Sequence, residues 1–392
     1  GIWAGVGTRD ENLDHNGAAH MVEHMLFKGT PTRSALQIAA QIEDVGGQMN
    51  AYTSREITSY HIHLMQEDAP LALDILADMY LNSTLPDDEV ERERQVILQE
   101  IGMTQDTPDD LIFDNYYETA YPKQSLGAPI LGTTKHITGM TRAMLADYIE
   151  RLYTPARTVI SAAGNVDHDA FVDQVSRLFG AMNPDKPHAK LPAQYTPGEH
   201  RLKKDLEQAH IVLGFQGVRR SDPDYYSAQA LSTLLGGGMS SRLFQEIREK
   251  RGLVYSIYSF HSSYQDDGQF GIYAGTGPQS LPELVPVTAQ EILKFADTMT
   301  EEEIARARAQ LKANMVMGRE SMMTRAAQQA KYLLLREKVI DIGELVRQIE
   351  NISRESIARV AKKIFSAKPV VAALGPLGTL ESYESIVKRL AA

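Results

Sequence analysis

The sequence of 392 residues contains no cysteine, and this absence sets the first limit on its chemistry. Disulfide bonds and thiolate catalysis are excluded, so any metal site has to use histidine, aspartate or glutamate side chains. The sequence also has no run of 18 or more apolar residues, and we therefore expect no membrane span. With 43% hydrophobic and 23% charged residues, the composition is that of a globular protein.

Positive charge is in short supply as well. The chain has 40 lysines and arginines against 51 aspartates and glutamates, which gives a formal net charge of −11. Nucleic-acid-binding proteins need a basic surface to meet the phosphates, and no basic stripe is present here. We therefore expect no nucleic-acid partner, and the charge suits basic peptides better.

What the sequence does contain is a His-x-x-Glu-His motif, formed by His20, Glu23 and His24 among apolar residues typical of a buried helix. Residues four apart share a helix face, about 6 Å apart along the axis, so both imidazoles can bind one ion. Glu23 shares this face and can reach a metal-bound water. Zinc lowers the pKa of such a water towards ~7, and a carboxylate beside it can accept the proton. The motif is the inverzincin signature. The alternative is a polar helix face whose histidines bond to carbonyl groups.

A catalytic zinc needs a third protein ligand, and the charged helix expected at residues 89–100 offers two candidates. Glu93 and Glu100 are seven residues apart, about two helical turns, and so project from nearly the same side. One of them can bind the metal while the other orients a ligand from behind. The residues by themselves leave open which glutamate does which, and a charged helix without a metal is the alternative.

The chain is too long for one ordinary core, and its two halves repeat each other. Residues 85–92 resemble residues 299–306, and residues 137–142 resemble residues 349–354. Such a duplication predicts an α+β protein with two similar α/β-sandwich domains. The second copy has Ala307 and Asn314 at the positions of Glu93 and Glu100 and has no His-x-x-Glu-His motif, so we expect one zinc ion per chain. The predicted divisions are a zinc-binding domain at 1–182, a proline-rich linker at 183–205 and a second domain at 206–392.

Sequence patterns also predict individual elements. Helical periodicity and capping residues indicate helices, and alternation of apolar and polar residues indicates strands. The expected helices cover residues 34–44, 69–82, 141–152 and 169–179, and the expected strands cover 50–54, 58–65 and a buried stretch at 158–165.

The segments His20–Thr30, Asn50–Glu56 and Glu93–Glu100 together resemble the pitrilysin-type zinc peptidases. The similarity extends over essentially the whole chain and is to the two-domain branch, which includes the mitochondrial processing peptidase β subunit and bacterial processing proteases. The resemblance implies that Glu100 is the third zinc ligand. It also implies that Glu93 is the buried glutamate that orients a ligand.

The same resemblance implies roles for residues that bind substrate. Asn50 and Ala51 begin an extended segment whose edge pairs with the substrate backbone in the family, a β-augmentation that tolerates many sequences. Arg248 and Tyr255, within Ile247–Tyr255, resemble an arginine and tyrosine pair that reaches the substrate from the second domain. A tyrosine hydroxyl there stabilises the developing oxyanion. An ordinary edge strand and an ordinary packing surface are the alternatives.

The resulting prediction is a zinc metalloendopeptidase that hydrolyses peptides or unfolded polypeptide segments in a chamber between facing subunits. We expect a homodimer, or a heterodimer with a related subunit, in which Arg248 and Tyr255 of one chain serve the zinc of the other. A noncatalytic substrate-binding subunit and a structural subunit of a larger assembly are the alternatives. The expected compartment is the bacterial cytoplasm. The mitochondrial matrix and the periplasm stay open, because Gly1–Gly7 has the pattern of a strand interior and a leader could precede it.

Overall fold

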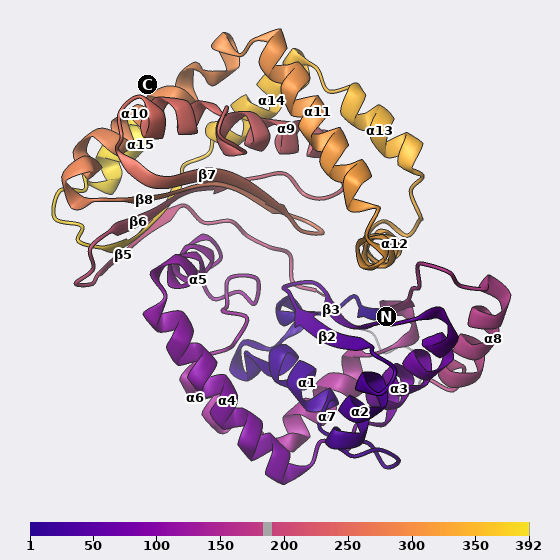
Figure 1. The fold of residues 1–392 in the computed structure, drawn as a ribbon. Coiled ribbons are helices and arrows are strands. Elements are labelled where there is room, and N and C mark those ends of the chain that lie inside the picture. Colours follow the sequence, from indigo (N-terminus) through magenta and orange to yellow (C-terminus); the bar gives the residue numbers. More distant parts are fainter. Residues whose placement is uncertain (183–189, 392) are drawn as a thin grey trace. The chain divides into compact units, whose positions relative to one another are not determined.

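A computed structural model of the chain describes residues 1–182 and 190–391. The contacts between residues divide it into two compact units, and each unit combines one sheet with several helices (Figure 1). The α+β class and the two α/β sandwiches predicted from the sequence are confirmed. Unit 1 comprises Gly1–Met103, Lys123–Leu191 and Met317–Ile340, and unit 2 comprises Thr104–Pro122, Pro192–Val316 and Asp341–Ala392.

Unit 1 is built on a four-stranded antiparallel sheet. Its strands lie in the order β2-β3-β1-β4, so β2 and β4 are the edges. β2 and β3 form a hairpin in which Asn50 faces His61 and Ala51 faces Tyr60. The strands are β1 (Ile2–Ala4), β2 (Gln48–Thr53), β3 (Thr58–His63) and β4 (Thr158–Ile160).

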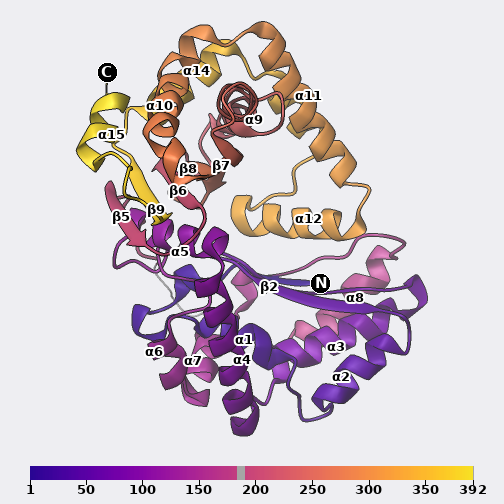
Figure 2. The same cartoon turned by 60° about the vertical axis from the view of Figure 1, so that its left-hand side comes forward.

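Helices cover both faces of this sheet. On one face, α1, α3 and α7 contribute buried apolar residues to a common core. On the other lies α12, drawn beside the strands of this sheet in Figure 2. It contacts β1 and β4, and its Ala326 and Ala330 lie beside the buried Trp3. The helices are α1 (Ala18–Leu26), α2 (Ala35–Glu43), α3 (Ala69–Asn82), α4 (Asp87–Asp106), α6 (Thr134–Gly139), α7 (Arg142–Leu152), α8 (His168–Phe179) and α12 (Met322–Arg336).

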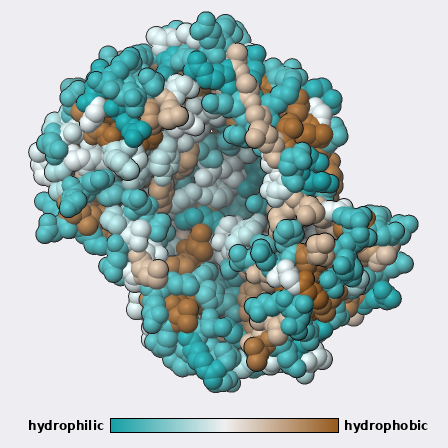
Figure 3. All heavy atoms as spheres, in the orientation of Figure 1, coloured by the Kyte–Doolittle hydropathy of each residue, from teal (hydrophilic) through white to brown (hydrophobic). Residues whose placement is uncertain are grey.

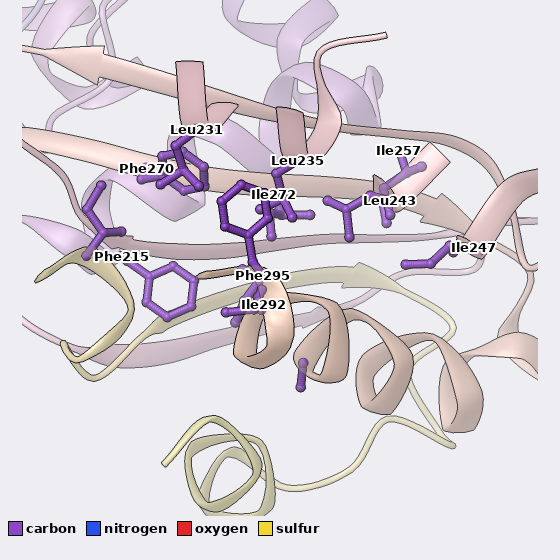
Figure 4. Packing of buried hydrophobic residues seen from close by; sticks show 14 of the residues in the cluster. Phe215, Leu231, Leu235, Leu243, Ile247, Ile257, Phe270, Ile272, Ile292 and Phe295 are labelled. Carbon is purple, nitrogen blue, oxygen red and sulfur yellow. The ribbon is translucent and has the colours of Figure 1, made fainter. Parts of the chain in front are cut away.

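Unit 2 is built on a five-stranded sheet in the order β5-β9-β6-β8-β7, in which only β5 and β9 run parallel. Its large core lies between the sheet and α9, α10 and α14, where Phe215, Phe270 and Phe295 are fully buried (Figure 4). The elements are β5 (Gly198–Lys203), β6 (Ala209–Gln216), β7 (Val254–Ser263), β8 (Gly268–Thr276), β9 (Val370–Gly375), α5 (Pro108–Ala120), α9 (Tyr225–Gly236), a π-helix (Phe244–Glu249), α10 (Leu281–Thr298), α11 (Glu301–Gly318), α13 (Ile342–Glu350), α14 (Arg354–Phe365) and α15 (Tyr383–Leu390).

The two units interleave along the chain because each repeat gives one helix to the other sheet. α5, from the first half, packs on β5, β6 and β9 of unit 2, while α12, from the second half, belongs to unit 1. Each follows the long helix of its repeat, α4 or α11, so the exchange is reciprocal. The division at 182 and 206 stays a prediction about the duplicated halves, since the compact units cross it.

Two local expectations differ from the structure. The predicted linker contains β5, which lies at the sheet edge, pairs only with β9 and therefore keeps the polar composition of a linker. The buried strand expected at 158–165 is the short edge strand β4, and its residues are only half-buried. Residues 183–189 of the predicted linker lie outside the described residues.

The described residues include no helix that is both long and apolar enough to cross a membrane. On the face drawn in Figure 3, hydrophilic residues predominate and hydrophobic ones form separate small patches.

Asp78 on α3 fixes the loop that follows α1. Its Oδ2 accepts hydrogen bonds from Thr30 Oγ1 (2.6 Å), Thr32 Oγ1 (2.7 Å) and Arg33 Nη1 (2.8 Å). Its Oδ1 accepts one from Asn82 Nδ2 (3.0 Å). Burial opposes ionisation of this carboxyl, but the hydrogen bonds outweigh it and lower the pKa of Asp78 to about 2.

We expect Asp78→Asn to lower the free energy of unfolding near neutral pH by about 1 to 3 kcal/mol, since charged hydrogen bonds are lost. The folded-state pKa lies below the unfolded value, so this contribution is present above about pH 4 and disappears as the pH falls through about 2. Urea unfolding of both proteins over this range measures it. Asp44→Asn is the control, because Asp44 is an exposed aspartate of the same unit. A difference that stays constant down to about pH 2 would contradict the assignment.

Candidate metal centre

The helix that carries the His-x-x-Glu-His motif, α1, is fixed along one face and at its start. Its apolar residues are buried in the core of unit 1. At its N-terminus, the buried Glu11 accepts hydrogen bonds from the backbone N–H of Gly17 (3.0 Å) and of Ala19 (2.7 Å). Gly17 has a φ of 97°, which suits glycine. Glu11 thus satisfies N–H groups that the helix leaves unpaired, and sequence reasoning missed it because it lies in a preceding loop.

His20, His24 and Glu100 come together at one point. One ligand atom from each lies within 4.8 Å of the others. Glu100 Oε2 is 3.7 Å from His20 Nε2, and Glu100 Oε1 is 3.9 Å from His24 Nε2. Tetrahedral zinc holds nitrogen and oxygen ligands at about 2.0–2.2 Å, which separates neighbouring ligand atoms by roughly 3.4 Å. Small side-chain movements would therefore place all three around one ion.

Two buried polar atoms beside this point have no hydrogen-bond partner, namely His20 Nδ1 and Glu23 Oε2. Burial lowers the pKa of His20 to about 4, and the neighbouring His24 acts in the same direction. His20 is therefore a neutral imidazole near neutral pH, which is the form that binds metals. Two imidazoles and one carboxylate are a common set for catalytic zinc, so the residues present fit this ion.

Glu93 lies behind the ligands. Its Oε2 is 2.8 Å from His24 Nδ1, and its Oε1 is 2.6 Å from the ammonium of Lys28. Burial opposes its ionisation, but these two partners outweigh burial and lower the pKa of Glu93. The geometry thus separates the two glutamates that the residue pattern left open: Glu100 faces both Nε2 atoms, and Glu93 contacts the far side of one ring. Sequence reasoning missed Lys28, although it stands four residues after His24.

Glu23 lies on the same helix as the two histidines and is partly buried. Burial raises the pKa of its carboxyl; His24 opposes this rise, and Glu100 adds to it. A carboxylate with a raised pKa holds an accepted proton more firmly, which suits a general base that later acts as an acid.

Asn50 and Ala51 lie on β2, the edge strand of the sheet in unit 1. β2 pairs with β3 on one side only, so its other edge carries no strand among the described residues. α1 contacts β2. The predicted substrate-binding residues therefore lie on a free strand edge next to the helix that carries the histidines.

Arg248 and Tyr255 belong to unit 2, whereas the three candidate ligands belong to unit 1. Arg248 lies in the π-helix, with its guanidinium carbon 4.7 Å from the centre of the Phe244 ring. The buried Ile247 anchors this segment in the core (Figure 4). Tyr255 is 76% exposed, at a shift in the pairing register of β7. Both segments are thus held firmly while the tyrosine hydroxyl remains available.

Two family models match this chain. The family described as "Insulinase (Peptidase family M16)" matches residues 1–134, and "Peptidase M16 inactive domain" matches residues 139–311. This chain belongs to peptidase family M16. The resemblance to pitrilysin-type zinc peptidases is thereby confirmed. Within the described residues of this M16 chain, the one group of three potential ligands lies in the first match and none lies in the second.

Relatives of the M16 chain are named as proteases. It is 41% identical over 372 residues to an "Uncharacterized zinc protease" of Rickettsia felis, covering 95% of this chain and 90% of the relative. It is 39% identical over 388 residues to the "Uncharacterized zinc protease YmxG" of Bacillus subtilis, covering 97% and 94%. The crystal structure of a protease from Helicobacter pylori has the same fold, with a TM-score of 0.88, 24% identity and coverage of 96% and 92%.

We expect the two glutamates to respond differently to substitution. Glu100→Gln removes a candidate ligand and should lose stoichiometric zinc on dialysis. Glu93→Gln should keep zinc but bind it about 10- to 100-fold more weakly, as is usual for residues that orient a ligand. Glu91→Gln is the matched control on α4, since the Glu91 side chain is 62% exposed. Competition with a chelator measures all three. If Glu93→Gln lost zinc while Glu100→Gln kept it, Glu93 would be the ligand and Glu100 the residue that orients it.

Proposed function

We propose that this M16 chain is a zinc-dependent endopeptidase, with His20, His24 and Glu100 as the ligands of one zinc ion. The observation that carries the proposal is the convergence of these three side chains with the unpaired oxygen of Glu23 beside them. A noncatalytic or structural subunit would need neither a complete ligand set nor a positioned carboxylate. The family membership and the names of the relatives support the same reaction class.

Bound zinc would lower the pKa of a water molecule to about 7 and polarise the scissile carbonyl. Glu23 then acts as the general base: it accepts the proton of the attacking water and later delivers it to the leaving amine nitrogen. Its burial and raised pKa support both steps. Glu93 holds the imidazole of His24 in one orientation through Nδ1.

The substrate in this proposal is an extended peptide or an unfolded polypeptide segment. The free edge of β2 at Asn50 and Ala51 binds its backbone as an additional strand, so side-chain sequence matters little there. Tyr255 donates a hydrogen bond to the developing oxyanion, and Arg248 holds the substrate near the scissile bond. The exposure of Tyr255 and the free edge of β2 support these roles.

We further propose that the active form is a homodimer, or a heterodimer with a related subunit, which encloses the substrate in a chamber. Arg248 and Tyr255 of one chain then serve the zinc of the facing chain.

The general-base role predicts that Glu23→Gln retains one zinc per chain and the stability of the wild type but loses roughly 10²- to 10⁴-fold in kcat. Cleavage of an unfolded protein, measured with and without a chelator, together with metal analysis of the same samples, gives the result. Glu91→Gln serves as the control for loss of a carboxylate elsewhere. Wild-type activity in Glu23→Gln would refute the mechanism.

If Tyr255 of one chain acts at the zinc site of the facing chain, two inactive variants should complement each other. If Glu23→Gln and Tyr255→Phe chains are mixed and allowed to exchange in a homodimer, mixed dimers contain one intact site and total activity recovers to about a quarter of wild type. If both residues act within one chain, mixing restores nothing. The oligomeric state measured by light scattering accompanies the assay, because a monomer cannot show the effect.

A further inference from the structure

Lys28, in the turn that follows α1, is linked through Glu93 to the candidate ligand His24. Its ammonium is 2.6 Å from Glu93 Oε1, and Glu93 Oε2 is 2.8 Å from His24 Nδ1. The side chains of Lys28, Glu93 and His24 are only 25%, 9% and 19% exposed. Both oxygens of the glutamate are therefore committed, each to a different partner.

The backbone around Lys28 is fixed as well. Its N–H donates to the carbonyl of Met25 at the end of α1 (3.1 Å), and the carbonyl of the next residue, Gly29, accepts from Thr84 N (3.1 Å). Lys28 thus lies in the turn that follows α1, where its side chain and that of His24 both contact Glu93. A cation at this place also suits the C-terminal end of α1.

The contact to Glu93 matters because of the second nitrogen of the His24 ring. A carboxylate that accepts the Nδ1 proton keeps it on that atom and leaves Nε2 free. His24 Nε2 is the atom that lies 3.9 Å from Glu100 Oε1. Without Lys28, the buried Glu93 carboxylate would lose one of its two partners and could turn away from His24.

We propose that Lys28 is a positioning residue of the zinc site, which acts through Glu93 to hold His24 with Nε2 directed at the metal. This inference rests on the proposed function in one respect, namely that His20, His24 and Glu100 hold zinc. It goes beyond that function by naming a residue that tunes metal affinity without touching the metal.

The test measures the dissociation constant for zinc alone, by chelator competition on the full chain. Lys28→Met should bind zinc about 10- to 100-fold more weakly, and Lys28→Arg, which keeps a cation, should restore affinity to within about threefold. Lys135→Met, a substitution of an exposed lysine on α6 of the same unit, should have no effect. Wild-type affinity in Lys28→Met would overturn the proposal.

The double substitution separates positioning from general stabilisation. If Lys28 acts through Glu93, adding Lys28→Met to Glu93→Gln should weaken zinc binding by no more than about twofold further, because the intermediary is already lost. If the two losses multiply, Lys28 acts independently and the proposal falls. Thermal unfolding of the metal-free proteins accompanies these measurements. Should Lys28→Met fail to fold, Lys28→Gln takes its place, and the same non-additivity with Glu93→Gln is required.

The outcomes also distinguish this inference from the proposed function. A wild-type chain that binds zinc but cleaves no peptide would contradict the endopeptidase and leave the role of Lys28 standing. Wild-type zinc binding with normal cleavage but no change in Lys28→Met would contradict only the role of Lys28.

Discussion

The candidate metal centre depends on the fold of unit 1, which holds two imidazoles and a carboxylate close together in a partly buried place. Each of these groups would be better solvated in water, so the fold has to supply the energy that keeps them there. It does so by burying the apolar face of α1 and by running α4 across the same core, with Val90, Ile97 and Ile101 buried. Glu100 thus reaches the histidines because its neighbours on α4 are fixed by hydrophobic packing.

Buried acidic side chains around α1 each have hydrogen-bond or ion-pair partners that offset the cost of burial. Glu11 satisfies the N-terminal end of the helix, Lys28 and Glu93 meet near its C-terminal end, and Asp78 fixes the loop beyond. Each of these acidic side chains has at least two hydrogen-bond or ion-pair partners, as buried polar groups require. Burial raises the pKa of Glu11 to about 8, so its hydrogen bonds do not keep it ionised near neutral pH. The helix that presents the ligands is therefore held at both ends, and its histidines need little rearrangement to bind a metal.

The chain has two sandwiches of the same kind, and among the described residues only one group of three side chains could hold a metal ion. In the second copy, α11 corresponds to α4, and Ala307 and Asn314 replace the two glutamates. The exchange of α5 and α12 between the repeats means that each sheet is completed by a helix from the other half of the sequence. Each sheet therefore has a helix from the other half of the sequence packed on it.

Much of this could be predicted from residues alone. The spacing of His20, Glu23 and His24 predicts a helix that could bind a metal, because a helix brings residues three and four apart onto one face whatever surrounds it. The helix at 34–44 and the strands at 50–54 and 58–65 likewise follow from local patterns. The choice between Glu93 and Glu100 did not follow, since both project from one side of α4, and only the resemblance to a family pointed to Glu100.

Local patterns also could not place α5 and α12 on the sheet of the other repeat, or reveal that β5 is a strand. Lys28 and Glu11 became visible only in three dimensions, because their partners are fixed by how α1, α4 and the loops pack. The sequence by itself determined the chemistry that a single helix can offer, and the tertiary structure decided which distant side chains complete it, because long-range distances depend on packing.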